Sequence, residues 1–130
     1  MKLLFTASTF SHIAHFHLPY LQWFQARGWT VHVACGGSPA SLPGATDVFH
    51  LPFEKRMSSP KNFYTARTLR AIIKKERYDL IITHTSLAAF FTRLAVKGMK
   101  KRPRVINMVH GYLFDGDTPA LKRNVLLAAE

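Results

Sequence analysis

The sequence of 130 residues, 48% of them hydrophobic, suits one domain with a substantial core and excludes an intrinsically disordered chain. Its formal net charge is +11, and of its 18 lysines and arginines only Lys2 and Arg27 precede Lys55. We therefore expect an anionic partner: phosphate, anionic lipid or nucleic acid. The single cysteine, Cys35, excludes an internal disulfide, and no segment is long enough to span a membrane, so we expect a cytoplasmic protein.

The first 28 residues predict a strand, a polar turn and a helix. Leu3–Ala7 is an apolar run of strand length, and Ser8–His12 is the turn. The helix that follows passes His15 and His17 and is closed by Gly28. A loop that leaves a buried strand presents backbone N–H groups and side chains at the sheet edge where open α/β sheets bind ligands.

Two further strands follow. Thr30–Cys35 ends at the turn Gly36–Gly37, and Val48–Leu51 is closed by Pro52. The glycine pair belongs to no G-x-G-x-x-G or G-x-x-x-x-G-K pattern, which disfavours a standard dinucleotide or P-loop site. His32 and His50 lie inside these strands, and we assign them structural roles.

A helix is predicted from Pro60 to about Arg77, with Ser59 as its N-cap. Its apolar residues at spacings of three and four are Phe63, Ala66, Leu69 and Ile73, which we expect to be buried. Two basic clusters are candidates for binding an anion or a membrane surface. They are Arg67, Arg70, Lys74 and Lys75 on this helix, and Lys100, Lys101 and Arg102 in a later connector. A solvated surface is the default interpretation of such residues, and the charge excess keeps an anionic partner open beside it.

The second half continues the alternation of strands and helices. Asp79–Thr83 predicts a fourth strand, with His84, Thr85 and Ser86 in its loop, and a helix then ends near Gly98. Val105–Val109 predicts a fifth strand, followed by His110–Gly111, and residues 118–130 predict a last helix. Apolar strands that alternate with helices indicate an α/β fold: a Rossmann-like parallel sheet with right-handed crossovers and helices on both faces.

Three histidines follow three different strands of this sheet. If the usual strand order holds, His12 and His84 flank the crevice where the chain reverses direction, with His110 beside them. An imidazole titrates near neutral pH and can exchange a proton with a sugar hydroxyl or a phosphate, although capping is a common alternative role. His15 and His17 have no cysteine or carboxylate beside them, so we predict no metal site.

Four segments together resemble the N-terminal domain of family 4 glycosyltransferases, which have the GT-B fold. The nearest resemblance is to the branch that builds bacterial capsular polysaccharides and exopolysaccharides. The segments are Ser11–Leu21, Gly28–Ala34, Tyr78–Ser86 and Arg104–Gly111, and the resemblance covers essentially the whole chain. The sequence departs from the family in placing Ser11-His12 where many members carry a glycine pair, which puts a backbone-only phosphate cradle in doubt.

The resemblance implies that residues 1–130 are a single Rossmann-like domain, the acceptor-binding half of a retaining hexosyltransferase. GT-B enzymes have a second, donor-binding domain with a paired-glutamate motif, which nothing in this sequence matches, so we expect this chain to be inactive alone. The implied donor is a nucleotide-sugar, with no further cofactor. The implied acceptor is a saccharide, often linked to polyprenyl diphosphate, which places the enzyme at the cytoplasmic face of the membrane.

The same resemblance gives roles to individual residues. His110 is the expected catalytic residue, contacting the transferred sugar and stabilising charge near the leaving phosphate. The expected substrate-binding residues are Ser11, His12, His84, Thr85, Ser86 and Gly111. Two alternatives stay open: half of a nucleotide-sugar 2-epimerase of the same fold, and a non-catalytic anion-binding module. Nucleic acid is disfavoured as a partner because the sequence has no aromatic-and-basic platform for a single strand and no recognition motif.

Overall fold

A single parallel sheet organises the computed structural model, which describes residues 1–37, 42–54, 56 and 58–108. Its strand order is β3-β2-β1-β4-β5, with all neighbouring strands parallel, which confirms the predicted Rossmann-like architecture. The chain adds β2 and β3 on one side of β1 and then β4 and β5 on the other, as predicted. The strands are β1 (Lys2–Ala7), β2 (Thr30–Cys35), β3 (Asp47–His50), β4 (Leu80–His84) and β5 (Arg104–Met108). The helices are α1 (Phe10–Phe16), α2 (Leu18–Ala26), α3 (Pro60–Glu76) and α4 (Ser86–Val96).

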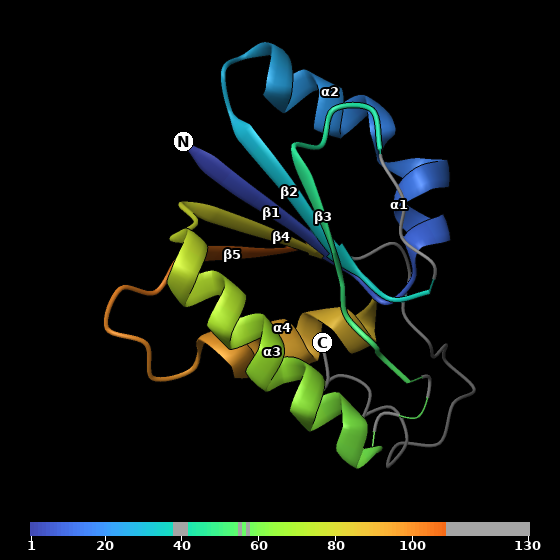
Figure 1. Cartoon of the computed structure of the whole chain (residues 1–130), viewed down its shortest axis with the longest axis vertical. Coiled ribbons are helices and arrows are strands. Elements are labelled where there is room, and N and C mark those ends of the chain that lie inside the picture. The colour runs from blue at the N-terminus through green and yellow to red at the C-terminus, as the bar shows by residue number, and fades with distance from the viewer. Residues whose placement is uncertain (38–41, 55, 57, 109–130) are drawn as a thin grey trace, which may run out of the picture.

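Helices cover both faces of the sheet, α1 and α2 on one side and α3 and α4 on the other (Figure 1). The alternation of side chains along β1 divides the core between these faces. Leu3 and Phe5 pack with α1 and α2, whereas Leu4 packs against Leu69 and Ile73 of α3. Full burial of one such side chain stabilises the fold by about 1.5–3 kcal/mol. Because β1 is buried on both faces, its carboxyl end is held firmly in the middle of the sheet.

The first helical segment differs from the prediction in two ways. It begins at Phe10, so Ser11 and His12 lie in the first turn of α1 and not in a loop. It also breaks at His17, which separates α1 from α2. Pro19 explains the break, because a proline has no N–H to donate and its ring clashes with the carbonyl four residues back. His17, at the junction, is buried.

The buried face of α3 is rotated from the predicted one. Phe63 is 50% exposed, so its assignment to the core was wrong, whereas Ala66, Leu69 and Ile73 are buried as predicted. Asn62, which is fully buried, takes part of the place expected for Phe63. Its amide oxygen accepts the backbone N–H of Glu54 at 2.8 Å, and its amide nitrogen donates to the carbonyls of Glu54 and Arg56. An apolar ring in this position would leave those backbone groups of Glu54 and Arg56 without their side-chain partner.

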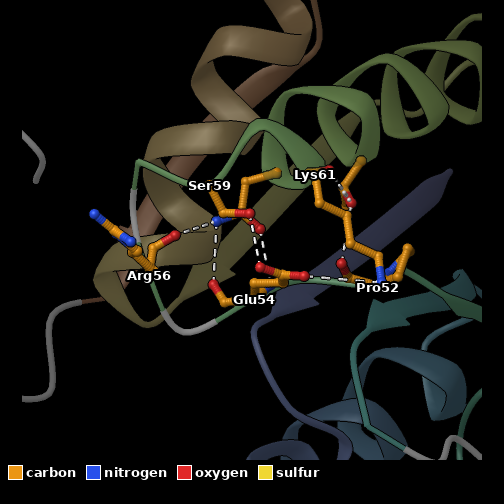
Figure 2. Close-up of polar contacts among 7 residues, drawn as sticks. Pro52, Glu54, Arg56, Ser59 and Lys61 are labelled. Atoms are coloured by element: carbon orange, nitrogen blue, oxygen red, sulfur yellow. Dashed lines mark hydrogen bonds and ion pairs between the residues drawn. The ribbon is translucent and has the colours of Figure 1, made fainter.

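Further polar contacts fasten the connector between β3 and α3 to the start of α3 (Figure 2). Ser59 donates its hydroxyl to Glu54 Oε2 at 2.7 Å, and Lys61 Nζ lies 3.9 Å from Glu54 Oε1. One turn later Thr65 donates to the carbonyl of Pro52 at 3.2 Å. The connector is therefore held by side chains at the start of α3 as well as by its own apolar residues, two of which pack in the core.

We expect the buried His32 to make the stability of the fold depend on pH. It is 3% exposed, and its Nδ1 lies 2.7 Å from the Tyr78 hydroxyl. Burial lowers the pKa of His32 below its usual 6.5, an effect that outweighs the opposing charges of Asp47 and Glu76. Below that pH the unfolded chain binds a proton more readily than the folded one. We therefore expect stability to fall as the pH drops below about 6.5, by at most about 1.4 kcal/mol per pH unit from this residue.

Thermal unfolding of the wild type and of His32→Gln at pH 7.5 and pH 5.5 tests this expectation. The variant should lose less stability on acidification than the wild type, because its amide has no proton to gain. An equal loss in both proteins would assign the acid sensitivity to other groups.

Candidate functional site

The carboxyl ends of β1 and β4 lie side by side in the middle of the sheet, at the point where the order of strand addition reverses. The loop after β1 also lies against the end of β2. The backbone N–H of Phe10 donates to the carbonyl of Gly36 at 2.9 Å, and a Cβ at Gly36 would meet the carbonyl oxygen of Ser8 at 2.4 Å. Only glycine permits this approach. Gly36 is therefore needed to bring the loops after β1 and β2 together.

Thr85 marks the other side of this junction with an unusual backbone. Its φ of 73° and ψ of 143° lie in a region that a β-branched residue rarely adopts. It caps α4, since its Oγ1 accepts the backbone N–H of Ala88 at 3.4 Å. Strained residues of this kind gather at functional sites, where the surrounding structure holds them in place. The predicted pair Thr85 and Ser86 thus stands at the carboxyl edge of the sheet, at the positive end of the α4 dipole.

Two substitutions of Thr85 should change stability in opposite directions. Glycine at this position relieves a backbone strain of about 1–3 kcal/mol. Against this gain, the flexibility of glycine in the unfolded chain costs about 0.5–1 kcal/mol, and loss of the cap costs a few tenths of a kcal/mol. Thr85→Gly should therefore stabilise the protein by about 1 kcal/mol. Thr85→Ala keeps the strain and loses the cap, so it should destabilise by about 1 kcal/mol. Denaturant unfolding measures both, and a stability loss in both variants would contradict a strained Thr85.

His84 has a different position from the one expected. It is the last residue of β4, not a loop residue, and it is 2% exposed. Its ring stacks parallel to that of Phe5, with 5.2 Å between centroids, and lies 3.8 Å from the ring of His17. This burial favours a supporting role beneath Thr85 over direct contact with a substrate. The partner His17 was predicted to be a helix-entry residue, because no local pattern links it to His84.

The two histidines border a small apolar cavity near the carboxyl ends of β4 and β5. Its volume is about 90 Å³, and Met108 and Tyr20 close it on other sides. Pockets for small-molecule ligands usually measure about 300–1,000 Å³. This cavity is therefore too small to be a hexose site on its own.

The remaining predicted substrate residues are distributed as follows. Ser11 is exposed on α1, and its hydroxyl lies 3.4 Å from that of Thr9. His12 occupies the same helical turn. His110 and Gly111, like the helix expected over 118–130, lie outside the described residues. The structure thus brings the segments after β1 and β4 together, and the role of His110 stays a prediction.

Most of the predicted anion-binding residues lie near the opposite edge of the sheet. Five of them line one groove at the amino ends of β4 and β5, namely Arg70, Lys74, Lys100, Lys101 and Arg102. Arg67 and Lys75 are exposed on α3 but do not line that groove. Arg70 is half-buried rather than fully solvated, because its guanidinium donates to carbonyls at the end of α4.

Other reactive groups give no sign of an additional chemistry. Burial raises the pKa of the Cys35 thiol to about 11, so it is a packing residue and not a nucleophile at neutral pH. Among residues 1–37, 42–54, 56 and 58–108, no three histidine, cysteine or acidic side chains gather in a way that could hold a metal ion. In the same part of the chain, no helix combines the length and hydropathy needed to cross a bilayer.

Comparison with known proteins identifies the family of this chain. The model of Glycosyltransferase Family 4 matches residues 13–129, nearly the whole chain. The chain belongs to glycosyltransferase family 4. It is also 34% identical over 119 residues to a Bacillus subtilis (strain 168) protein named putative glycosyltransferase EpsD. The match covers 91% of this chain and 31% of that relative, so the chain spans about a third of the relative's length.

Two solved structures share the fold of this family 4 chain. A UDP-GlcNAc 2-epimerase from Neisseria meningitidis, solved with UDP-GlcNAc bound, superposes with a TM-score of 0.57 and 16% identity. An L-amino acid ligase from Bacillus licheniformis superposes with a TM-score of 0.51 and 19% identity. The matches cover 83% and 76% of this chain, and 32% and 24% of those chains. At these identities the likeness establishes the fold alone.

Proposed function

We propose that this family 4 chain is the acceptor-binding half of a retaining hexosyltransferase in the synthesis of a cell-surface polysaccharide. The observation that carries the proposal is the family match over residues 13–129. The 34% identity to EpsD supports it independently. The strand order also indicates where a substrate would bind, since the carboxyl ends of β1 and β4 lie where open α/β sheets bind ligands.

The reaction is the transfer of a sugar from a nucleotide-sugar to a hydroxyl group of a saccharide. The bond between the sugar's anomeric carbon and the diphosphate oxygen breaks, and a bond to the acceptor oxygen forms with retained configuration. The acceptor hydroxyl passes its proton to the departing diphosphate, and the nucleoside diphosphate is released. In this proposal Thr85 and Ser86 hold the acceptor, with Ser11 and His12 across the junction. His110, next to Gly111, stabilises negative charge on the leaving phosphate.

The donor is held mainly by a second Rossmann-like domain, so this chain has no transfer activity alone. The acceptor is a saccharide linked to polyprenyl diphosphate at the cytoplasmic face of the membrane. The net charge of +11 supports attraction to a surface rich in anionic lipids.

The test supplies the intact protein with radiolabelled nucleotide-sugars and a lipid extract from cells that make the polysaccharide. We expect label to pass into the lipid-linked saccharide fraction while nucleoside diphosphate is released. The alternative, half of a nucleotide-sugar 2-epimerase, is suggested by the structural likeness to the Neisseria enzyme. It would instead leave the nucleotide-sugar intact and invert its C2 centre, which NMR distinguishes from transfer.

A further inference from the structure

A groove of about 840 Å³ runs between the C-terminal end of α3 and the connector from α4 to β5. We call it the basic groove, because its lining contains Arg70, Lys74, Arg77, Lys100, Lys101 and Arg102. Ile73, Tyr78 and Met99 give it an apolar floor. Figure 1 shows the connector, in orange, near the end of α3 and on the side where β1 begins. Its volume lies in the range of pockets that hold small ligands.

The positive charge in the basic groove exceeds what the fold itself requires. The ends of α3 and α4 each carry the equivalent of about half a negative charge, and Asp79 contributes one more. Six cations against these leave an excess of roughly four positive charges. Within the described part of the chain, no ion pair joins any of the six to a carboxylate. The negative charge at the two helix ends therefore does not account for all six cations.

Two of these arginines are positioned by the backbone around them. Arg70 donates to the carbonyls of Ala95 and Lys97, at 3.0 and 2.7 Å, and so ties one wall of the groove to the other. Arg77 ends α3 with a φ of 55°, a left-handed conformation that favours glycine. An arginine at this point brings a charge into the groove where a glycine would bring none. These two arginines are thus held in place, and the other wall of the groove is the connector from α4 to β5.

We propose that the basic groove is a second binding site, specific for a phosphate-bearing anion. Guanidinium and ammonium groups are the usual partners of phosphate oxygens. The ligand is the headgroup of an anionic phospholipid or a soluble diphosphate, which offer the same chemistry to these side chains. The site is distinct from the transfer edge at Thr85, since β4 separates the two by its five residues, about 17 Å. It does not depend on the proposed transfer reaction.

The test compares two triple variants of the intact protein that remove the same charge. The groove variant is Lys74→Gln, Lys101→Gln and Arg102→Gln, three exposed cations. Arg70 and Arg77 are left in place because they hold helix ends. The control variant is Arg27→Gln, Arg56→Gln and Lys61→Gln, which are exposed cations outside the groove. Co-sedimentation measures binding to vesicles of phosphatidylcholine with or without phosphatidylglycerol, and calorimetry measures binding of inorganic pyrophosphate.

We expect the wild type to bind at least one probe, either the phosphatidylglycerol vesicles or pyrophosphate, and to prefer anionic to neutral vesicles if the lipid is the ligand. The groove variant should bind that probe about a hundredfold more weakly, and the control variant should lose much less. Loss in the vesicle assay alone identifies a headgroup, and loss with pyrophosphate alone identifies a soluble diphosphate. The proposal is overturned if neither probe binds the wild type, or if the two variants weaken binding equally, which would reflect net charge only.

Discussion

His110→Ala lowers sugar transfer by the intact enzyme by about a hundredfold or more, the scale expected for loss of one group that stabilises charge in the transition state. In the sequence His110 comes two residues after the end of β5, and Gly111 follows it. In the proposed mechanism its imidazole stabilises the charge of the leaving phosphate. The measurement is kcat for transfer, with thermal unfolding recorded on the same samples.

His50→Ala is the matched control, because His50, which was expected to be structural, has an exposed imidazole at the end of β3. It should leave both transfer and stability nearly unchanged. For His110→Ala the melting temperature should change little while kcat falls. If the variant instead unfolds easily and its folded fraction keeps normal turnover, His110 is a structural residue and the assignment is wrong.

His84→Ala should destabilise the protein by about 3 kcal/mol, mainly by leaving a cavity against Phe5 and His17. Stacked aromatic pairs add about 0.5–1.5 kcal/mol beyond burial, and this contribution is lost as well. Calorimetric or denaturant unfolding measures the change. The transfer activity of the folded fraction should fall only if the substitution displaces Thr85 and Ser86.

His84→Phe separates packing from chemistry at this position. It keeps an aromatic ring in the stack and removes both ring nitrogens, so it should recover the packing part of the stability and most of the transfer activity. A folded, stable His84→Phe protein that has lost transfer a hundredfold would show that the imidazole contacts the substrate, as the sequence had suggested.

The sheet could be predicted because its signals are local. Each strand is a short apolar run such as Leu3–Ala7, and an apolar strand followed by a helix permits almost no topology other than a right-handed parallel unit. The strand order then places the ends of β1 and β4 together, so the position of Thr85 and Ser86 at the carboxyl edge could be predicted. Their part in binding a substrate stays a prediction.

The roles of individual side chains could not be predicted, because they depend on packing between distant segments. Phe63 has a core spacing on α3, yet the amide of Asn62 takes the inner position since it pairs with the connector at Glu54. His84 looks like a loop residue until β4 is seen to include it and to stack it on Phe5. The charge excess predicted an anion-binding surface, but nothing local showed that Arg70 reaches the end of α4.

The central claim is that this half of the enzyme binds the acceptor. Its most direct test measures KM for the acceptor and KM for the nucleotide-sugar separately in the Ser86→Ala variant of the intact enzyme. If this half binds the acceptor at the carboxyl edge, the variant should raise KM for the saccharide acceptor about tenfold, the loss of one hydrogen bond. KM for the nucleotide-sugar should stay unchanged. Thr46→Ala, which removes an exposed hydroxyl just before β3 at the opposite edge, should change neither. A rise in KM for the nucleotide-sugar, with KM for the acceptor unaffected, would contradict the assignment of this edge to the acceptor.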